Sequence, residues 1–242
     1  MKYNLQKAFR SHKVWLLFFS TVCLLSVKGQ DSTYIRPPVT DRYRLYKKQV
    51  KADPDKKMTE LKSAVPGILY DLRYASTENF MHRLMYPAGT SATFLRKPAA
   101  LALSEVQRSL RQQGLGLKIF DAYRPYSVTV KFWELVKDAR FVAHPRNGSG
   151  HNRGAAVDLT IVQLSTGQEL DMGTGFDNFT DSAHHGFAAL PEMIIQNRLL
   201  LRSLMEQNGF RAYEDEWWHY SWPGAAKTEL LDIPFRKLAK GL

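Results

Sequence analysis

The sequence predicts an α+β fold in one domain, with a central, mainly antiparallel sheet flanked by helices. Segments rich in β-branched and aromatic residues are interspersed with segments whose apolar residues recur at helical spacing. Residues 30–242 are long enough for one sizeable core, and their tryptophans, tyrosines and phenylalanines supply large apolar areas. No internal repeat or low-complexity tract interrupts them, so a single mixed domain is expected.

Residues 1–29 have the pattern of a secretory signal peptide. Four lysine and arginine residues precede an apolar run at 14–27, and the small residue Gly29 follows it. The run is shorter than the roughly 20 residues that cross a bilayer core, so we expect export, cleavage near residue 29 and no stable membrane span afterwards. The alternative is an uncleaved N-terminal anchor. Cys23 is the only cysteine, so the cleaved protein can form no disulfide.

The charge of the chain argues against a nucleic-acid-binding protein. The formal net charge is +11, of which residues 1–29 contribute five cations and no acids, leaving +6 for residues 30–242. The lysines and arginines are scattered along the sequence and form no basic stripe interleaved with aromatic residues. A modest positive excess suits an anionic cell envelope or an anionic substrate terminus.

Residues 30–64 are predicted to form an N-terminal arm on the surface. They combine the prolines 37 and 38 with the charged run KKQVKADPDKK at 47–57, and they show little periodic apolar pattern. The compact domain is expected to span 65–242. Its first strand is expected in VPGILYDLRYA at 65–75, entered through Pro66 and Gly67.

Two helices and a strand are predicted next along the chain. Residues 98–114 have apolar residues at roughly helical spacing and end at Gly114. The segment GLKIFDAY at 116–123 is a short strand. A second helix begins at Pro125, with Val128, Phe132 and Leu135 on one face.

The C-terminal half is expected to hold two further strands and one long helix. The loop RNGSG at 146–150 leads into the strand AAVDLT at 155–160. Residues 192–209 form an amphipathic helix that ends at Gly209. The aromatic-rich segment FRAYEDEWWHYSW at 210–222 favours β structure.

The stretch SGHNRGAAVDLT at 149–160 indicates a metal site. Asp158 stands inside the predicted strand, where an uncompensated carboxylate would be costly to bury. Gly154 permits a tight bend, so His151 and Asp158 can converge on one point, and His219 offers a third ligand. Two histidines and a carboxylate with one open position is the composition of a catalytic zinc site. The alternative is that His151 is a loop histidine and Asp158 a satisfied strand carboxylate.

Glu216 lies three residues before His219 and is a candidate proton carrier. On a helix the two would share a face, whereas on a strand a bend or bulge must bring them together, and the sequence leaves this open. A glutamate beside a metal can take a proton from bound water and return it to the leaving amine. The alternative is a solvated acidic cluster of Glu214, Asp215 and Glu216.

These motifs resemble those of the zinc D-alanyl-D-alanine dipeptidases of the VanX type in peptidase family M15. The first motif is S-x-H-x-x-G-x-A-x-D, filled by Ser149, His151, Gly154, Ala156 and Asp158, and the second is E-W-W-H at 216–219. The resemblance extends from about Val65 to Tyr220 through DLRYAS, DAYRP and MGTGFD. It implies a DD-peptidase/hedgehog-like fold with the zinc site at the sheet.

The resemblance also implies roles for individual residues. One zinc ion per subunit would be held by His151, Asp158 and His219, with Glu216 as general base and acid. Arg124 in DAYRP would stabilise the tetrahedral oxyanion; the alternative for Arg124 is a structural pair with Asp121. The matched substrate-binding positions are Asp177 and Tyr74, which would hold the substrate ammonium, and Ser149, which would lie close to the dipeptide.

We therefore expect a secreted, periplasmic zinc dipeptidase that hydrolyses D-Ala-D-Ala or a related D,D-dipeptide in cell-wall peptide turnover. The alternatives are a peptidoglycan D,D-carboxypeptidase or endopeptidase with the same zinc site, and a non-catalytic zinc-stabilised binding module. The interval between Arg124 and Ser149 is short for the resistance-type enzymes, so the lid and the substrate range are open. The sequence does not predict the oligomeric state.

Overall fold

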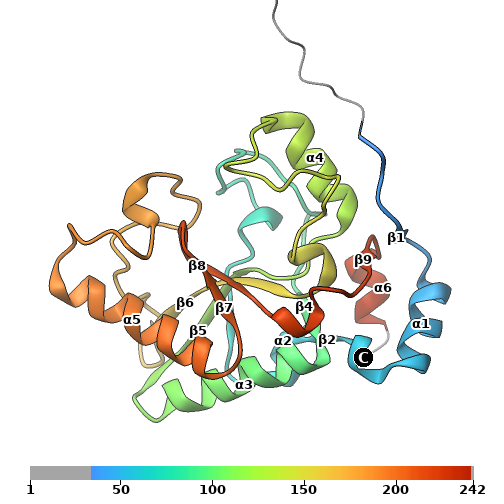
Figure 1. Ribbon diagram of the computed structural model, residues 1–242. Helices are drawn as coiled ribbons and strands as arrows, with labels where there is room; N and C mark the ends of the chain where they lie inside the picture. Colours follow the sequence, from blue (N-terminus) through green and yellow to red (C-terminus); the bar gives the residue numbers. More distant parts are fainter. Residues whose placement is uncertain (1–33, 241–242) are drawn as a thin grey trace, which may run out of the picture. The chain divides into compact units, whose positions relative to one another are not determined.

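The computed structural model describes residues 34–240, which belong to one compact unit (Figure 1). The predicted signal peptide lies outside the described residues and stays a prediction. Among residues 34–240, no helix has both the length and the apolar character that a membrane crossing requires.

A five-stranded sheet forms the centre of this unit, with the strand order β3-β5-β6-β8-β7. Its strands are β3 (Leu69–Tyr70), β5 (Leu115–Asp121), β6 (Ala156–Gln163), β8 (Glu216–Ser221) and β7 (Arg211–Tyr213). The β3–β5 pair is parallel and the other pairs are antiparallel. The predicted α+β class with a mainly antiparallel sheet is confirmed.

Two long helices, α3 (Lys97–Arg111) and α5 (Glu192–Gln207), pack beside each other against this sheet (Figure 1). Their apolar stripes bury Leu103 and Leu201, among others, in one core cluster with sheet residues such as Ile119 and Leu159. Each such side chain contributes roughly 1.5–3 kcal/mol when it is fully buried. This cluster fixes the strands that carry the polar residues described below.

A second core cluster lies under helix α4 (Tyr126–Val136) and contains Tyr74, Phe94 and Phe132. Tyr74 belongs to the short 3-10 helix η2 (Arg73–Ala75), where a continuous strand is predicted. That strand is wrong beyond β3, because the chain leaves the sheet after residue 71 and turns Tyr74 into the second cluster. An apolar and aromatic run does not distinguish a continuous strand from such a turn.

Residues 34–64, predicted as an arm, pack within the same compact unit. They contain β1 (Val39–Thr40), α1 (Tyr43–Ala52), η1 (Pro54–Lys56), β2 (Met58–Glu60) and α2 (Leu61–Ala64). Strand β2 pairs antiparallel with β4 (Phe94–Arg96), and Leu61 is fully buried in the main core. The division of the chain at residue 65 stays a prediction about domain organisation.

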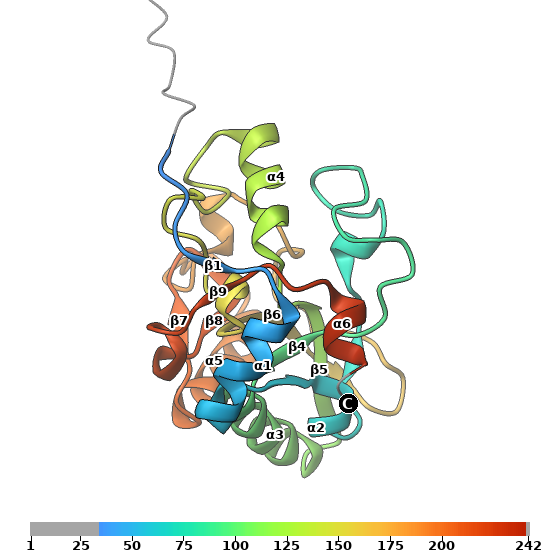
Figure 2. The ribbon, with the colours of Figure 1, turned by 90° about the vertical axis from the view of Figure 1, so that its right-hand side faces the viewer.

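The C-terminal residues return to this N-terminal segment. Strand β9 (Leu230–Leu231) pairs in parallel with β1, and helix α6 (Phe235–Ala239) follows it. Figure 2 shows α1 and α6 on the same side of the unit.

Candidate metal centre and active site

Three acidic and imidazole side chains form a row across the central sheet. Asp121 in β5 faces Asp158 in β6, and Asp158 faces His219 in β8. Directly opposed residues on antiparallel strands have Cβ atoms only about 4.5–5.5 Å apart. Strand register therefore brings residues 158 and 219 together, and His219 Nδ1 lies 2.8 Å from Asp158 Oδ1.

His151 reaches the same point from the 3-10 helix η3 (His151–Arg153), which leads into β6. Gly154 ends this helix with φ +66°, and a Cβ atom there would lie 2.5 Å from Met58 Cε. Nδ1 of His151 is 2.7 Å from the carbonyl oxygen of Ala122. Because a carbonyl only accepts, Nδ1 carries the proton and Nε2 keeps its lone pair free for a metal. Nε2 lies 3.4 Å from Asp158 Oδ2.

The donor atoms of His151, Asp158 and His219 suit a zinc ion. One ligand atom from each residue lies within 4.8 Å of those of the other two, so small side-chain shifts can bring all three to one cation. Two imidazole nitrogens and one carboxylate oxygen match the ligand types of catalytic zinc sites. Within residues 34–240, this triad is the one group of three histidine, cysteine or acidic side chains close enough together to hold a metal ion.

Asp158 keeps its negative charge although it is buried. Burial alone would raise its pKa, but the adjacent imidazoles of His151 and His219 outweigh burial and hold the pKa well below its usual value. A buried carboxylate of this kind needs positive charge beside it.

Glu216 begins β8 and lies beside the triad. Its Oε2 atom is 3.9 Å from His219 Nδ1. The pairing of β7 with β8 is irregular between Ala212 and Tyr213, next to the turn that leads to Glu216. On a regular strand, residues 216 and 219 would point to opposite faces of the sheet. The irregular pairing lies in this part of β8 and is the kind of bulge that can bring the two side chains to one side.

The environment of Glu216 differs from that of its acidic neighbours. Burial raises the pKa of Glu216, and the negative charge of Asp158 adds to this effect. Glu214 instead is exposed and pairs with Arg202 at 2.7 Å. The acids at 214–216 therefore do not form one solvated cluster.

Arg124 lies behind the triad, held by Asp121. Its Nε and Nη2 atoms donate to Asp121 Oδ2 at 3.1 and 2.8 Å, and its guanidinium lies 4.8 Å from the ring centroid of Phe132. Asp121 also accepts a 2.6 Å hydrogen bond from the hydroxyl of Tyr86. The structural pair weighed as an alternative for Arg124 is thus present, and it fixes the guanidinium at the cavity wall.

Asp177 and Tyr74 meet although they are far apart in the sequence. The Tyr74 hydroxyl is 3.0 and 3.1 Å from the two carboxylate oxygens of Asp177. Burial raises the pKa of Asp177 well above its usual value, and the charge of Asp158 raises it further. A cation placed beside Asp177 would relieve both effects.

Ser149 stands at the turn before η3. Its backbone N–H donates to Asn152 Oδ1 at 2.9 Å, and its hydroxyl accepts from the N–H of Asn152 at 3.3 Å. Asn152 Nδ2 donates in turn to the carbonyl of Arg124 at 2.8 Å. The turn that carries Ser149 and His151 is therefore tied to the segment that carries Arg124.

All eight predicted site residues line one cavity of about 260 Å³. This volume is below the roughly 300–1,000 Å³ typical of sites for drug-sized ligands, so the cavity suits a small substrate. Sequence reasoning did not identify the other side chains of its wall, because they belong to no motif. They include Phe80, Arg140, Phe141, Tyr213 and Trp218.

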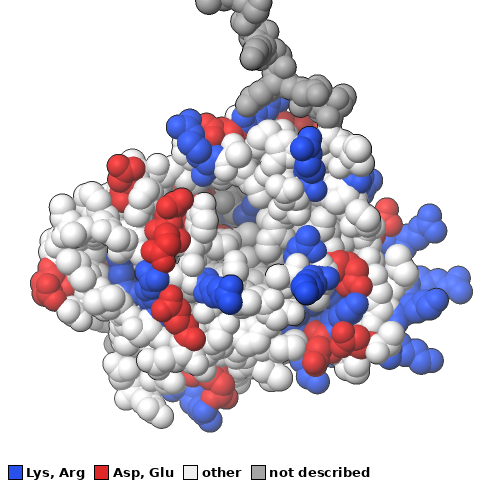
Figure 3. All heavy atoms as spheres, in the orientation of Figure 1, with Lys and Arg blue, Asp and Glu red and all other residues white. Residues whose placement is uncertain are grey.

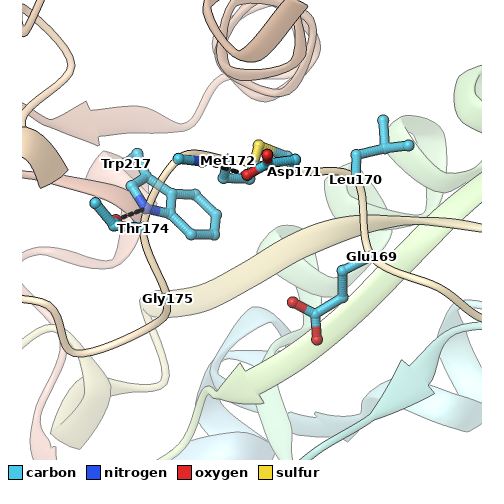
Figure 4. A pocket seen from close by; sticks show the side chains of 8 residues that line it. Glu169, Leu170, Asp171, Met172, Thr174, Gly175 and Trp217 are labelled. Atoms are coloured by element: carbon cyan, nitrogen blue, oxygen red, sulfur yellow. Dashed lines mark hydrogen bonds between the residues drawn. The ribbon is translucent and has the colours of Figure 1, made fainter. Parts of the chain in front are cut away.

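A second cavity of about 410 Å³ lies beside Trp217 and the segment 169–175 (Figure 4). The Trp217 indole donates to Thr174 Oγ1 at 2.8 Å. Successive strand residues point to opposite faces of a sheet, and Trp218 lines the first cavity. None of the eight predicted residues lines the second cavity.

The matched family model and the sequence relatives agree with one another. A family model described as D-ala-D-ala dipeptidase (peptidase M15) matches residues 54–240. The chain is 34% identical to a D-alanyl-D-alanine dipeptidase of Escherichia coli K12, covering 74% of this chain and 91% of the relative. It is 30% identical to one from Enterococcus faecalis (70% and 89% covered) and 33% identical to one from Streptomyces coelicolor (65% and 87%). The solved LdcB LD-carboxypeptidase aligns with TM-score 0.36 and 22% identity (61% and 69%), too distant to bear on substrate.

Proposed function

The chain belongs to the D-alanyl-D-alanine dipeptidase family of M15 metallopeptidases, and from that premise we propose that it hydrolyses D-Ala-D-Ala or a closely related D,D-dipeptide in cell-wall peptide turnover. The observation that carries this proposal is the convergence of eight side chains from distant segments on one small cavity. They provide a metal triad, a partly buried acid, a buried guanidinium, a partly buried carboxyl with a tyrosine partner, and Ser149.

One zinc ion per subunit would be held by His151 Nε2, an oxygen of Asp158 and His219 Nδ1. The opposite nitrogen of each imidazole has its own partner, Ala122 O for His151 and Ser221 Oγ for His219 at 3.3 Å. Such partners orient metal-binding histidines. Zinc in such a site polarises a carbonyl and lowers the pKa of bound water to about 7.

Glu216 is the general base and then the general acid. It takes a proton from the attacking water and gives it to the amine that leaves. Burial raises the pKa of Glu216. A carboxylate with a raised pKa accepts a proton from water more readily, and the resulting carboxyl can still donate that proton to the leaving amine.

Arg124 stabilises the negative charge that develops on the scissile carbonyl oxygen. Asp121 and the rings of Tyr74 and Phe132 hold its guanidinium in place before the reaction. A preorganised cation of this kind favours the transition state over the ground state.

Asp177 and Tyr74 bind the free ammonium of the substrate, and Ser149 lies beside the bound dipeptide. A buried carboxylate makes charge-assisted hydrogen bonds to an ammonium. It disfavours an acylated amine, which has no charge to offset the burial. This pair therefore selects a dipeptide over a longer peptide stem.

The proposal places the enzyme outside the cytoplasm, with residues 1–29 as signal peptide, 30–64 as arm and 65–242 as the zinc dipeptidase domain. It is supported by the basic, apolar and small-residue pattern of the leader.

The glutamate test uses two matched substitutions. Glu216→Gln should retain stoichiometric zinc in metal analysis and lose about 10²–10⁴-fold in kcat, the range for general acid–base catalysis. Glu214→Gln, which changes an exposed acid two residues away, should leave kcat unchanged. Undiminished turnover in Glu216→Gln contradicts the assignment.

A substrate panel tests the reaction itself. The enzyme should cleave D-Ala-D-Ala and reject its N-acetyl derivative and peptidoglycan pentapeptide. Cleavage of only the longer substrates identifies a carboxypeptidase or endopeptidase. Zinc and dipeptide binding without any cleavage identifies a binding module.

A further inference from the structure

Helices α1 and α6 lie together although nearly the whole described chain separates them. The parallel pair β1–β9 aligns Val39 with Leu230 and Thr40 with Leu231. Parallel strands run in the same direction, so the helices that follow them begin at the same end of the pair. Tyr46 of α1 and residues of α6 share one core cluster, and Figures 1 and 2 both show the helices as neighbours.

The outward sides of these helices form a cationic face. Its members, all exposed, are Arg42, Arg44, Lys47, Lys48, Lys51, Arg236, Lys237 and Lys240. No acidic residue occurs between 42 and 52 or between 235 and 240. In the space-filling view, blue side chains project from the side of the molecule where Figure 1 draws α1 (Figure 3).

This face accounts for the whole positive excess of residues 30–242. Their formal net charge is +6 and the face contributes eight cations, so the remainder carries −2. None of the eight has a carboxylate within 4.0 Å in the described part of the chain. A solvated charge run is common, but here the fold gathers cations from both ends of the chain and leaves them unneutralised. The result is a local positive potential.

We propose that the cationic face binds the anionic surface of a phospholipid bilayer. Its cations stand on the exposed sides of two helices, which suits a broad surface better than a polymer strand in a groove, and Arg236 also borders a cavity. Leu45 of α1 is 44% exposed among the cations and offers an apolar contact to the interface.

The sequence before α1 favours a bilayer over other anionic partners. The apolar run at 14–27 is the segment that meets a membrane if the chain is exported as proposed, and this step alone rests on that proposal. Fourteen residues lie between Val27 and Arg42, so before the leader is cleaved these two residues are at most about 50 Å apart. The face therefore lies within reach of that membrane until the leader is cleaved.

Vesicle binding tests the inference with protein beginning at residue 30, which retains both core clusters. Co-sedimentation should show binding to phosphatidylcholine vesicles that contain phosphatidylglycerol, little binding without it, and loss of binding at high salt. A basic residue near such a surface contributes roughly 1 kcal/mol, about fivefold in partition, so the triple variant Lys47→Gln, Lys48→Gln, Lys51→Gln should bind about 100-fold more weakly.

The control variant is Lys62→Gln, Arg108→Gln, Arg111→Gln, which removes three exposed cations outside the cationic face. It has the same net charge as the triple variant of the face. It should bind nearly as well as the wild type, and both variants should keep full activity on the soluble dipeptide. Equal loss in the two variants overturns the proposal, because net charge alone would then explain binding. Binding to soluble polyphosphate but not to anionic vesicles overturns it in favour of a polymer partner.

Discussion

Replacing Arg198 by methionine should damage the proposed ammonium subsite at Asp177, although Arg198 does not belong to that subsite. Arg198 in α5 is 4% exposed and donates to three backbone carbonyls, from Nε to Met172 at 2.8 Å, from Nη2 to Ser182 at 2.8 Å and from Nη1 to His184 at 3.1 Å. These carbonyls flank the segment that carries Asp177, whose φ of +60° is unusual for a non-glycine residue. Arg198 thus holds both ends of that segment.

The magnitude follows from the bonds that are lost. Hydrogen bonds from a charged donor contribute about 1.5–3 kcal/mol each, so three give about 4–9 kcal/mol before other effects. No carboxylate lies within ion-pair distance of Arg198 among residues 34–240, and burying an unpaired cation costs several kcal/mol. The net loss of unfolding free energy should therefore be about 2–4 kcal/mol. A displaced Asp177 forfeits a further charge-assisted bond to the ammonium, which should raise KM by about 10–100-fold.

Urea unfolding and steady-state kinetics on D-Ala-D-Ala separate these effects. Arg198→Met should raise KM far more than it lowers kcat, and it should weaken discrimination against N-acetyl-D-Ala-D-Ala. Arg198→Lys should recover little, because an ammonium cannot reach three carbonyls in a fixed fork. Arg202→Met, which removes a partly exposed arginine one turn later, is the control and should change neither KM nor specificity. Lower stability with an unchanged KM and specificity would show that Arg198 is only a structural residue.

Three further outcomes test other parts of the fold and site. Gly154→Ala should destabilise by about 1–3 kcal/mol more than Gly167→Ala in urea unfolding, since both have positive φ but only residue 154 would crowd Met58; equal effects contradict this packing argument. Burial lowers the pKa of His185 to about 4, so the unfolded chain takes up a proton at a higher pH than the folded protein does. The free energy of unfolding should therefore fall by about 1–2 kcal/mol as the pH drops from 6.5 to 4, and the partial exposure of His185 limits the size of this effect. The charged groups around His185 are Arg198, Arg202 and Glu214. The pH slope should flatten in His185→Gln, and an unchanged slope refutes the assignment. Chelation should abolish hydrolysis and lower the melting temperature, because zinc at 100 times its Kd adds about 2.7 kcal/mol; activity that survives full metal removal contradicts the metal assignment.

The predicted elements that match best are those with strong local signals. Helix α5 has a long apolar stripe and a terminal glycine, and β6 has a β-branched run after a glycine-rich loop, so both were predicted close to their observed bounds. The N-terminal segment had no such signal. Its buried apolar residues, which include Tyr46, Met58 and Leu61, share core clusters with residues far along the chain. Periodicity within a segment cannot reveal contacts of that kind.

The eight residues that meet at the cavity were identified from motifs, but their arrangement was not predictable. Motif spacing named Asp158 and His219 without saying that β6 and β8 are neighbours in the sheet. Their direct opposition depends on strand register, and a slip of one residue would turn one of them to the other face. Register in turn depends on the packing of α3 and α5 against the sheet, which is a property of the whole unit.

Arg124 shows why a structural and a catalytic interpretation of one residue need not compete. The sequence set a pair with Asp121 against an oxyanion role, as if one excluded the other. In the structure Asp121 also faces Asp158 across the sheet, so the residue that orients the guanidinium belongs to the same row as the metal triad. A buried cation is useful for catalysis only if it is held in place before charge develops. Asp121→Asn should therefore lower kcat more than it weakens dipeptide binding, whereas a pair that serves stability alone would leave kcat unchanged.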